Sequence, residues 1–319
     1  MKHMRIAFID SVHPLLGEKL TASGHEVVMH HTVDDAGLPA ALIDVQGIVV
    51  RSRHIGSDLL ACAKDLRFIA RVGSGLENID TAYCRQNDIR VYNSPEGNRD
   101  GVGETCVMLL LALMKALVRA NTQVHSGLWM REENRGTDLR GKTVGIIGYG
   151  QMGSAFAEKL RGFGVKVLAH DKYRSGFERA GVRECLLERL LRESDVISMH
   201  LPLSKETYHY ADHDFFLRLG KPVWFLNTSR GAIVHTAALL DALDHGRVIA
   251  AGLDVLEFER ADLSGVDPAM EPATQQRLFG HPRVLLTPHI AGVTHEGRYK
   301  MADVLARKIL EAFPNGTPS

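Results

Sequence analysis

Short apolar runs alternate with amphipathic segments along the first hundred residues. The runs are rich in Ile, Val or Phe and are bounded by Gly, Asp, Asn or Ser, which is typical of β-strands. The segments between them, such as 14–20 and 58–63, carry apolar residues at helical spacing. Strands that alternate with helices predict a parallel sheet covered on both faces. The predicted strands are 5–9, 26–30, 47–51, 67–72 and 90–93.

Residues 101 to about 125 contain little turn chemistry after Gly103, and we predict one long helix there, followed by an irregular polar connector over 127–141. The longest apolar stretch, 106–114, ends at Lys115 and is too short for a membrane span, which needs about 20 residues. From residue 143 the alternation starts again and predicts a six-stranded, doubly wound sheet. Its strands are 143–147, 166–170, 196–200, 223–227, 248–254 and 284–287, before a last helix at about 296–312 and a polar tail at 314–319.

Composition argues against some classes of binding partner. Lys plus Arg and Asp plus Glu both number 38, so the chain has no overall attraction to nucleic acid or to an anionic membrane. Four scattered cysteines (62, 84, 106 and 185) without a CxxC pair indicate reduced thiols and a cytoplasmic location. The first apolar run ends at Asp10 without a small-residue cleavage site, so we interpret it as a strand and not as a signal peptide.

The strongest local signal is the glycine pattern Gly148-Tyr-Gly150-Gln-Met-Gly153 between a predicted strand and a predicted helix. Gly148 permits a tight turn, Gly150 lets a pyrophosphate approach the backbone, and Gly153 lets helix and strand pack closely. The helix N-terminus offers N–H groups and a positive dipole end to phosphates. Glycines often only make a turn, but the flanking strand and helix match the dinucleotide-binding fingerprint, with Gln151 and Met152 in the binding turn.

Asp171, which ends the next predicted strand about 20 residues on, indicates which dinucleotide binds. A carboxylate there accepts hydrogen bonds from the adenosine ribose hydroxyls and repels a 2′-phosphate, which favours NAD over NADP. Lys172 and Arg174 lie beside it and weaken this inference. We predict NAD as the cofactor and no bound metal.

Arg230, Glu259 and His289 each follow one of the last predicted strands. Ligands of doubly wound sheets bind beyond the carboxyl ends of the strands, so these side chains are expected to converge although they are distant in sequence. Each has a plainer interpretation: Arg230 as a structural ion-pair partner, and His289 as one of 16 histidines. His200, His281 and His295 are the nearby alternatives to His289, and Glu257 is the alternative to Glu259.

A series of ordered motifs carries a family resemblance. The motifs are Val50-Arg51-Ser52, the run from Val72 to Asp80, Asn93-Ser94-Pro95-Glu96-Gly97-Asn98, the glycine pattern, His200-Leu201-Pro202-Leu203, Asn227-Thr228-Ser229-Arg230-Gly231 and Thr287-Pro288-His289. In these the chain resembles the D-isomer-specific 2-hydroxyacid dehydrogenase family over essentially its whole length, most of all the phosphoglycerate dehydrogenase branch. The resemblance implies an NAD-dependent oxidoreductase that transfers a hydride between nicotinamide and C2 of a D-2-hydroxy acid.

The resemblance also implies roles for individual residues. Arg230 would bind the substrate carboxylate and 2-oxygen, His289 would exchange the hydroxyl proton, and Glu259 would orient the imidazole. An imidazole titrates at about pH 6.5 in the absence of neighbours, which suits both reaction directions. The spacing from Asp254 matches the family and favours Glu259 over Glu257. Beyond the glycine turn and Asp171, the implied cofactor contacts are His200, Pro202, Thr207, Thr228, Ser229, Asp254 and Gly292.

The implied substrate contacts are Arg51, Ser52, Ser74 and Gly75, together with Arg230 and His289. Backbone N–H groups at Ser74 and Gly75 would hold the carboxylate, and a guanidinium at position 51 suits a phosphate. D-3-phosphoglycerate, oxidised in serine biosynthesis, is therefore the expected substrate. A broad reductase of glyoxylate, hydroxypyruvate or other keto acids, an erythronate-4-phosphate dehydrogenase and an NADH-sensing transcriptional co-repressor are the alternatives.

The length of 319 residues indicates two domains. Chain order predicts a discontinuous, flavodoxin-like substrate domain of residues 1–100 plus 290–319, with a Rossmann NAD-binding domain of residues 101–289 inserted. The helix after Gly101 is expected to pack across the two-fold axis of a homodimer. Two departures from the family concern one loop: Arg260 replaces the usual proline after the glutamate, and the segment 261–280 is longer than usual.

Overall fold

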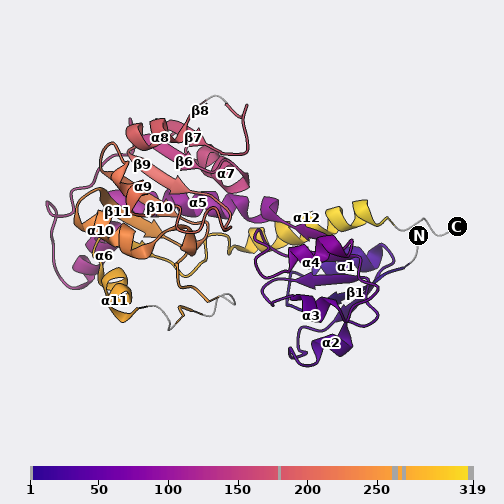
Figure 1. Ribbon diagram of the computed structural model, residues 1–319. Helices are drawn as coiled ribbons and strands as arrows, with labels where there is room; N and C mark the ends of the chain where they lie inside the picture. The colour runs from indigo at the N-terminus through magenta and orange to yellow at the C-terminus, as the bar shows by residue number, and fades with distance from the viewer. Residues whose placement is uncertain (1–2, 179–180, 261–264, 268–270, 315–319) are drawn as a thin grey trace. The chain divides into compact units, whose positions relative to one another are not determined.

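A computed structural model describes residues 3–178, 181–260, 265–267 and 271–314 (Figure 1). The chain divides into two compact units, and the first contains Met1–Arg99 and Val293–Ser319. The second contains Asp100–Arg260 and Ser264–Gly292. The breaks after Arg99 and after Gly292 lie close to the predicted domain boundaries at residues 100 and 289. The predicted polar tail falls outside the described residues from 315 onward, and so does part of the segment 261–280.

The first unit is built on a five-stranded parallel sheet with the strand order β2-β1-β3-β4-β5. This 2-1-3-4-5 order is that of the flavodoxin-like doubly wound fold, and it confirms the predicted fold class of this part. The strands are β1 (Arg5–Phe8), β2 (Glu26–Met29), β3 (Gly47–Val50), β4 (Phe68–Arg71) and β5 (Arg90–Asn93). The helices are α1 (Leu15–Ala22), α2 (Leu38–Ala41), α3 (Ser57–Leu60), α4 (Thr81–Gln86) and α12 (His295–Ala312).

Side chains alternate between the two faces of this sheet, as a strand requires. Along β1, Ile6 and Phe8 enter one apolar cluster, whereas Ala7 enters the cluster on the opposite face. α12 packs against α1 and adds Leu305 and Ile309 to the cluster of Ile6 and Phe8. The last helix of the chain therefore completes the core of a unit that began at the N-terminus.

The second unit contains a seven-stranded parallel sheet with the order β12-β11-β10-β9-β6-β7-β8. When the strands are numbered from β6 and the order is read from the β8 edge, it is 3-2-1-4-5-6-7. This is the Rossmann order extended by one strand. The strands are β6 (Thr143–Ile147), β7 (Lys166–His170), β8 (Val182–Glu184), β9 (Val196–Met199), β10 (Val223–Asn227), β11 (Val248–Leu253) and β12 (Val284–Leu286). The predicted count of six strands was wrong because β8, an edge strand of 3 residues, contains one apolar residue followed by Arg183 and Glu184, whereas the equally short β12 is an apolar run.

The predicted single helix over 101–125 was also wrong. α5 (Pro95–Met114) begins earlier, and α6 (Leu117–His125) follows after a bend of 62°. Ala116 lies between them with a left-handed φ of 50°, which no propensity scale predicts for alanine. α5 buries Leu109 and Leu110, whereas α6 buries none of its residues. The chain bends where it leaves the core, and among the described residues no single helix is long and apolar enough to cross a membrane.

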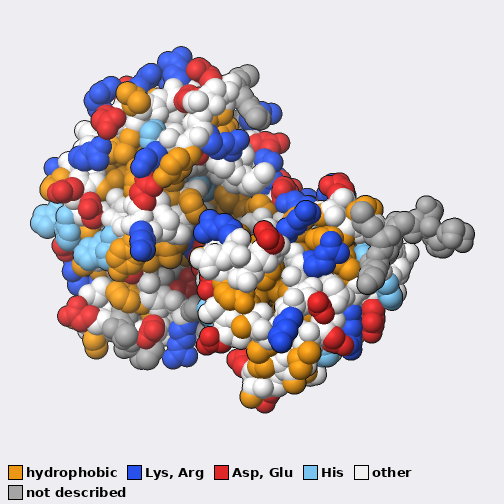
Figure 2. Space-filling view, turned by 45° about the vertical axis from the view of Figure 1, so that its right-hand side comes forward, with side chains coloured by type: hydrophobic (Ala, Val, Ile, Leu, Met, Phe, Trp, Pro, Cys, Tyr) orange, Lys and Arg blue, Asp and Glu red, His pale blue; other side chains and the backbone are white. Residues whose placement is uncertain are grey.

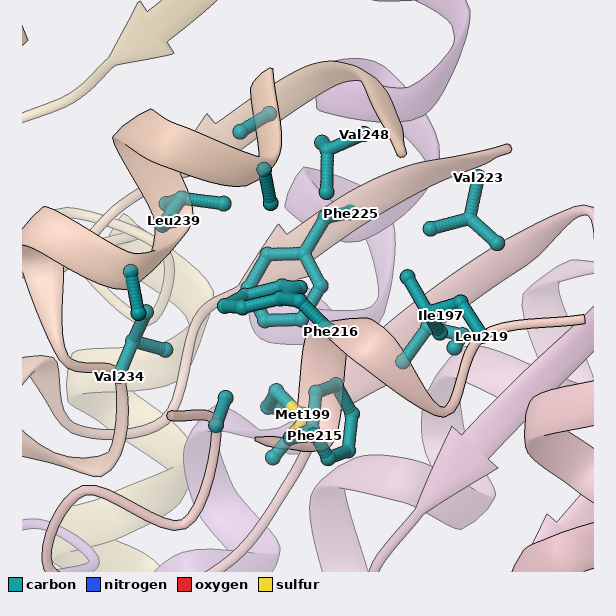
Figure 3. Packing of buried hydrophobic residues seen from close by; sticks show 14 of the residues in the cluster. Ile197, Met199, Phe215, Phe216, Leu219, Val223, Phe225, Val234, Leu239 and Val248 are labelled. Atoms are coloured by element: carbon teal, nitrogen blue, oxygen red, sulfur yellow. The ribbon is translucent and has the colours of Figure 1, made fainter. Parts of the chain in front are cut away.

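The core of the second unit places the strand ends that carry the candidate site. The rings of Phe215 and Phe216 pack against Phe225 of β10, with 5.4 Å between the centroids of Phe216 and Phe225 (Figure 3). Because this cluster is fully buried, the segments that follow β9 and β10 start from fixed points. The remaining helices of the unit are α7 (Gln151–Lys159), α8 (Leu187–Glu193), α9 (His213–Leu217), α10 (Thr236–Asp244), α11 (Pro272–Gly280) and the 3₁₀ turn η1 (Gly231–Ile233).

Candidate active site

The glycine pattern forms the turn between β6 and α7. Gly148 has a φ of +91°, a conformation that L side chains rarely adopt. A Cβ on Gly153 would lie 2.1 Å from the Gly148 carbonyl oxygen, so only glycine lets the helix approach the strand. A Cβ on Gly150 would meet nothing within 4 Å, and α7 starts at Gln151 without a side-chain cap. Open space above an uncapped helix N-terminus suits a pyrophosphate.

Asp171 follows β7 and reaches back to this turn. Its carboxylate accepts hydrogen bonds from the backbone N–H groups of Tyr149 at 2.8 Å and of Tyr173 and Arg174 at 3.0 Å each. The Lys172 ammonium, which weakened the prediction of NAD, forms an ion pair with Glu206. The carboxylate that is predicted to bind the ribose is therefore fixed beside the glycine turn, and the adjacent Lys172 is paired with Glu206.

The segment after β9 carries three of the predicted cofactor contacts. His200 is buried, its Nε2 lies 2.8 Å from the Ser198 hydroxyl, and burial lowers its pKa to about 3. Its Nδ1 has no hydrogen-bond partner among the described residues. The Thr207 hydroxyl donates to the Pro202 carbonyl at 2.6 Å and accepts from the Ser204 N–H at 2.8 Å, so it holds its own loop closed.

Asn227, at the end of β10, organises the turn that carries Arg230. Its side-chain N–H donates to the Arg230 carbonyl at 2.9 Å, and its oxygen accepts from the N–H and hydroxyl of Ser229 at 3.0 and 2.7 Å. The Arg230 guanidinium contacts the Ser229 carbonyl at 2.6 Å. Thr228 points to the interior, where its hydroxyl lies 3.2 Å from the Cys106 thiol, and burial raises the pKa of that thiol to about 12. Sequence reasoning gave Asn227 no role, although an amide directly before the turn was a usable signal.

His289 and Glu259 meet although 29 residues separate them in the sequence. The His289 Nδ1 lies 2.7 Å from the Glu259 Oε1, and the two side chains are 27% and 20% exposed. Glu257 does not compete for this contact, because its carboxylate is bound by His209 and by the Thr236 N–H. The structure thus pairs His289 with the glutamate that the sequence favoured. The other ring nitrogen of His289, Nε2, lies on the side of the ring away from Glu259.

Asp254 holds the turn that presents His289. Its carboxylate accepts hydrogen bonds from the Thr287 hydroxyl at 2.5 Å and from the N–H groups of Ile290 and Ala291 at 2.9 and 2.8 Å. The His289 N–H donates to the Asp254 carbonyl at 2.8 Å, and His289 itself has a left-handed φ of 54°. Asp254 is 1% exposed, so its carboxylate serves the turn. The predicted cofactor contact of Asp254, like that of Gly292 at the end of the unit, stays a prediction.

The alternative histidines lie in other segments of the fold. The His281 Nε2 lies 3.4 Å from Asp244, and His295 is the first residue of α12. Within the described ranges, no group of three or more His, Cys, Asp or Glu side chains is arranged to hold a metal ion.

In the first unit, the segment after β3 is held by Asp10. The Asp10 Oδ2 accepts hydrogen bonds from the N–H groups of Arg51, Ser52 and Arg53 at 2.7, 2.8 and 3.2 Å. The side chains of Arg51 and Ser52 are exposed, and the Arg51 guanidinium forms no hydrogen bond with the described residues. Sequence reasoning missed Asp10 because it stands about 40 residues before the segment that it supports.

The segment after β4 carries Ser74 and Gly75. The Ser74 hydroxyl donates to the Asn98 side-chain oxygen at 2.8 Å, and the Asn93 amide donates to the Ser74 carbonyl at 2.6 Å. The N–H groups of Ser74 and Gly75 have no acceptor among the described residues. Two adjacent N–H donors of this kind suit a carboxylate.

Comparison with known families decides the class of protein. Residues 107–291, more than half of the chain, match the family model described as "D-isomer specific 2-hydroxyacid dehydrogenase, NAD binding domain". The chain belongs to this family. It is therefore an NAD-dependent oxidoreductase, and the predicted family and cofactor are confirmed.

Curated relatives of this 2-hydroxyacid dehydrogenase include the glyoxylate reductase of Thermococcus litoralis, 38% identical over 82% of this chain and 78% of that one. The hydroxypyruvate reductase of Thermotoga maritima is 33% identical over 90% of both chains. The D-3-phosphoglycerate dehydrogenase of Bacillus subtilis is 34% identical over 85% of this chain but only 50% of its own length. Among solved structures, a D-lactate dehydrogenase of Aquifex aeolicus with NAD and lactic acid has a TM-score of 0.81 at 27% identity, covering 97% and 95% of the two chains.

The residues of the second unit fit NAD in this 2-hydroxyacid dehydrogenase. The uncapped N-terminus of α7 and the open space above Gly150 suit the pyrophosphate, and the fixed Asp171 carboxylate suits the ribose hydroxyls. The buried, uncharged His200 and the closed loop at Thr207 line the next strand end with neutral groups. Cofactor contacts of individual residues remain predictions, since the fit concerns the shape and charge of the turn.

Proposed function

We propose that this dehydrogenase interconverts a small 2-keto acid and the corresponding D-2-hydroxy acid. The observation that carries the proposal is the 2.7 Å contact between the His289 Nδ1 and the Glu259 carboxylate in the NAD-binding unit. Such a pair leaves Nε2 directed away from the carboxylate and ready to exchange a proton with a substrate oxygen. An imidazole oriented in this way suits the reversible reduction of a carbonyl group.

NADH, when bound, supplies the hydride that reduces the keto carbon. His289 donates a proton to the keto oxygen in reduction and takes it back in oxidation. Glu259 stabilises the protonated imidazole, because an adjacent carboxylate favours the charged form. The Arg230 guanidinium, at the end of the turn fixed by Asn227, polarises the same oxygen and binds the carboxylate through its fork of donors.

The carboxylate of the acid has a second candidate binding segment in the first unit. The N–H groups of Ser74 and Gly75 lack acceptors among the described residues, and Asn93 and Asn98 hold the loop that presents them. We propose that these N–H groups bind the carboxylate. Since they come from the backbone, the test is conformational: Asn98→Ala frees Ser74 and should raise KM for the acid more than it lowers kcat.

The substrate is proposed to be glyoxylate or hydroxypyruvate, the acids after which two relatives are named, and this chain matches both relatives over most of their length. A phosphorylated acid, D-3-phosphoglycerate, is the second candidate, and the exposed Arg51 guanidinium favours it because a guanidinium binds phosphate in a bidentate manner. The two candidates differ in whether binding needs a guanidinium at position 51, because only the phosphorylated acid carries a phosphate.

Steady-state turnover with each acid, followed by the absorbance of reduced nicotinamide, tests the proposal. Reduction of glyoxylate or hydroxypyruvate with unchanged KM in Arg51→Gln supports an unphosphorylated substrate. Oxidation of D-3-phosphoglycerate with KM raised about tenfold or more in the same variant supports the phosphorylated one. If none of these acids is turned over, the proposed substrate class is wrong.

We further propose a homodimer through α6. Leu117, Val118 and Val124 on this helix are 59%, 53% and 52% exposed, and none of its residues is buried. A helix with a separate apolar face packs that face against a partner, and a second copy of the same chain is the simplest one. Sedimentation of the wild type as a dimer and of Val118→Glu as a monomer would support the interface, whereas a wild-type monomer would contradict it.

A further inference from the structure

Glu257 carries a carboxyl group, yet its side chain is only 7% exposed. One carboxylate oxygen lies 2.5 Å from the His209 Nε2, and the other accepts a hydrogen bond from the Thr236 N–H at 2.8 Å. Thr236 is the first residue of α10, and His209 belongs to the segment between β9 and α9. A single buried carboxylate thus joins three segments that are far apart in the chain.

The His209 segment runs beside the turn that follows Arg230. The His209 N–H donates to the Ala232 carbonyl at 2.8 Å, and the Ala211 N–H donates to the Ile233 carbonyl at 3.0 Å. His209 has a left-handed φ of 52°, which directs its ring to Glu257 while its backbone stays on the turn. The position of this segment therefore fixes the chain directly after Arg230.

The same turn rests against the segment that leads to Glu259. A Cβ on Gly231 would lie 1.8 Å from the Leu256 carbonyl oxygen and 2.5 Å from the Glu257 nitrogen, so the two backbones are in direct contact there. The Glu259 N–H donates to the Leu256 carbonyl at 3.1 Å and closes a short turn. Glu257 stands inside this turn, one residue from the contact with Gly231 and two residues from Glu259.

We propose that Glu257 and His209 form a positioning pair that keeps Arg230 and Glu259 in place relative to each other. The inference rests on the proposed roles of Arg230 and of the His289–Glu259 pair. Neither member touches His289: the pair acts through the contact of Gly231 with Leu256 and through the turn that ends at Glu259. When the pair is broken, the Glu259 carboxylate moves more freely and supports the His289 imidazole less.

The surroundings of His209 provide a matched control. Its ring stacks on Tyr208 at 3.9 Å between centroids and lies 4.7 Å from the ring of His235. The ring of His213 lies 5.6 Å from the ring of His235, and its Nε2 lies 3.1 Å from Asp241. Histidine side chains gather at one edge of this unit (Figure 2). The His213–Asp241 pair has the same chemistry as the proposed pair, but it joins α9 to α10 and reaches no segment of the site.

The experiment compares His209→Asn with His213→Asn. Asparagine tolerates a positive φ and is too short to reach Glu257, so His209→Asn removes the contact with little strain. We expect kcat for keto-acid reduction to fall about tenfold while KM for NADH changes by less than about twofold. The midpoint of the pH–rate profile for reduction should move to lower pH, because a less closely held carboxylate stabilises the protonated imidazole less.

Glu257→Gln retains the acceptor for Thr236 and a hydrogen-bond partner for His209, so kcat should stay within about threefold of the wild type. His213→Asn should leave both kcat and the pH midpoint unchanged. An unchanged pH midpoint in His209→Asn, or an equal shift in His213→Asn, would overturn the proposal.

A readout without turnover separates this proposal from the proposed function. In protein labelled at the histidine rings, the NMR signal of His289 is assigned by its absence from His289→Asn. Its titration midpoint should move to lower pH in His209→Asn and stay unchanged in His213→Asn. If the wild type reduces none of the acids but this midpoint moves, the positioning pair stands and the substrate class fails. If the midpoint stays while the acids are reduced, the pair fails and the function stands.

Discussion

The two compact units share one structural feature, an aspartate that holds a neighbouring backbone segment. In each, an aspartate just beyond a strand holds the backbone that follows the neighbouring parallel strand. Asp10 follows β1 and holds the segment after β3, and Asp254 follows β11 and holds the segment after β12. Because both segments lie at the carboxyl ends of parallel strands, each is at the edge where ligands bind.

The surroundings of the two carboxylates differ. Asp10 is 13% exposed and has the Arg53 guanidinium 3.7 Å away. Asp254 is 1% exposed and, among the described residues, its carboxylate has only neutral donors. Its turn also contains a strained residue, since a left-handed φ costs a non-glycine residue about 1 kcal/mol. The difference teaches that the buried aspartate holds a strained turn, whereas the partly exposed one holds a segment without such strain.

The largest expected effect is that of Asp254→Asn. The amide replaces one acceptor oxygen by a donor that faces a backbone N–H, so at least one buried hydrogen bond to a charged acceptor becomes a repulsive contact. We expect the free energy of unfolding to fall by about 3 kcal/mol, measured by urea denaturation. Turnover should fall with it, because the strained turn at His289 loses its support.

Thr287→Val is the control, since it removes one of the three donors and leaves the carboxylate in place. It should destabilise the protein by about 1 kcal/mol, well short of Asp254→Asn. If Asp254→Asn unfolds at the same urea concentration as the wild type, the carboxylate does not hold the turn and the comparison with Asp10 has no basis.

His289→Asn separates the chemistry of the turn from its conformation. Asparagine tolerates a left-handed φ but supplies no acid–base group in this pH range. We expect kcat to fall by at least about a hundredfold, the usual size of a general acid–base contribution, with the urea midpoint unchanged. NADH binding, followed by quenching of protein fluorescence, should persist. Turnover within about threefold of the wild type would exclude His289 as the proton donor.

Sequence patterns predicted the elements whose residues are buried over several consecutive positions. The fully buried strands β3 and β10 stand out as continuous apolar runs, and the glycine turn stands out because only glycine fits its φ and its close contact. β8 was not predicted because two of its 3 residues are charged, unlike those of the equally short β12. The bend at Ala116 was not predicted because it reflects where the chain leaves the core.

Within the candidate site, the residues with distinctive chemistry were predicted and their supports were not. Glu259 was chosen because its spacing from Asp254 matches that of the family it resembles. The structure gives the geometric reason: Glu257 is turned to His209 and Thr236. Asp10 and Asn227 act through backbone groups of other residues, and such contacts depend on the tertiary fold and leave no local pattern. A single sequence shows the reacting groups more readily than the groups that hold them.

Acid should weaken the second unit more than the first. The His200 pKa of about 3 in the folded state lies below the ordinary value of 6.5, so the unfolded chain binds more protons between these values. The contribution of His200 to the free energy of unfolding is therefore fully present above pH 6.5. It decreases as the pH drops, so that the free energy of unfolding is about 2 kcal/mol lower at pH 5. Burial also lowers the pKa of His25 in the first unit, so that unit loses stability in the same direction.

The fluorescence of Trp224, buried in the second unit, reports on the effect of His200. Urea denaturation at pH 7.5 and pH 5 should show the loss in the wild type, and His200→Asn should remove most of it. Equal losses in both proteins would mean that His200 is not the group that titrates.

Asp10→Asn is expected to have the smallest effect, and it sharpens the comparison most. Its oxygen accepts three N–H groups, but solvent reaches the site and replaces part of what the amide loses. We expect the free energy of unfolding to fall by about 1 kcal/mol, and KM for a phosphorylated acid to rise if Arg51 binds it. The ratio of this loss to that of Asp254→Asn then compares three hydrogen bonds to a partly exposed aspartate with three to a buried one. Equal losses would mean that burial and strain do not distinguish the two turns, and that three hydrogen bonds to an aspartate have the same value in either place.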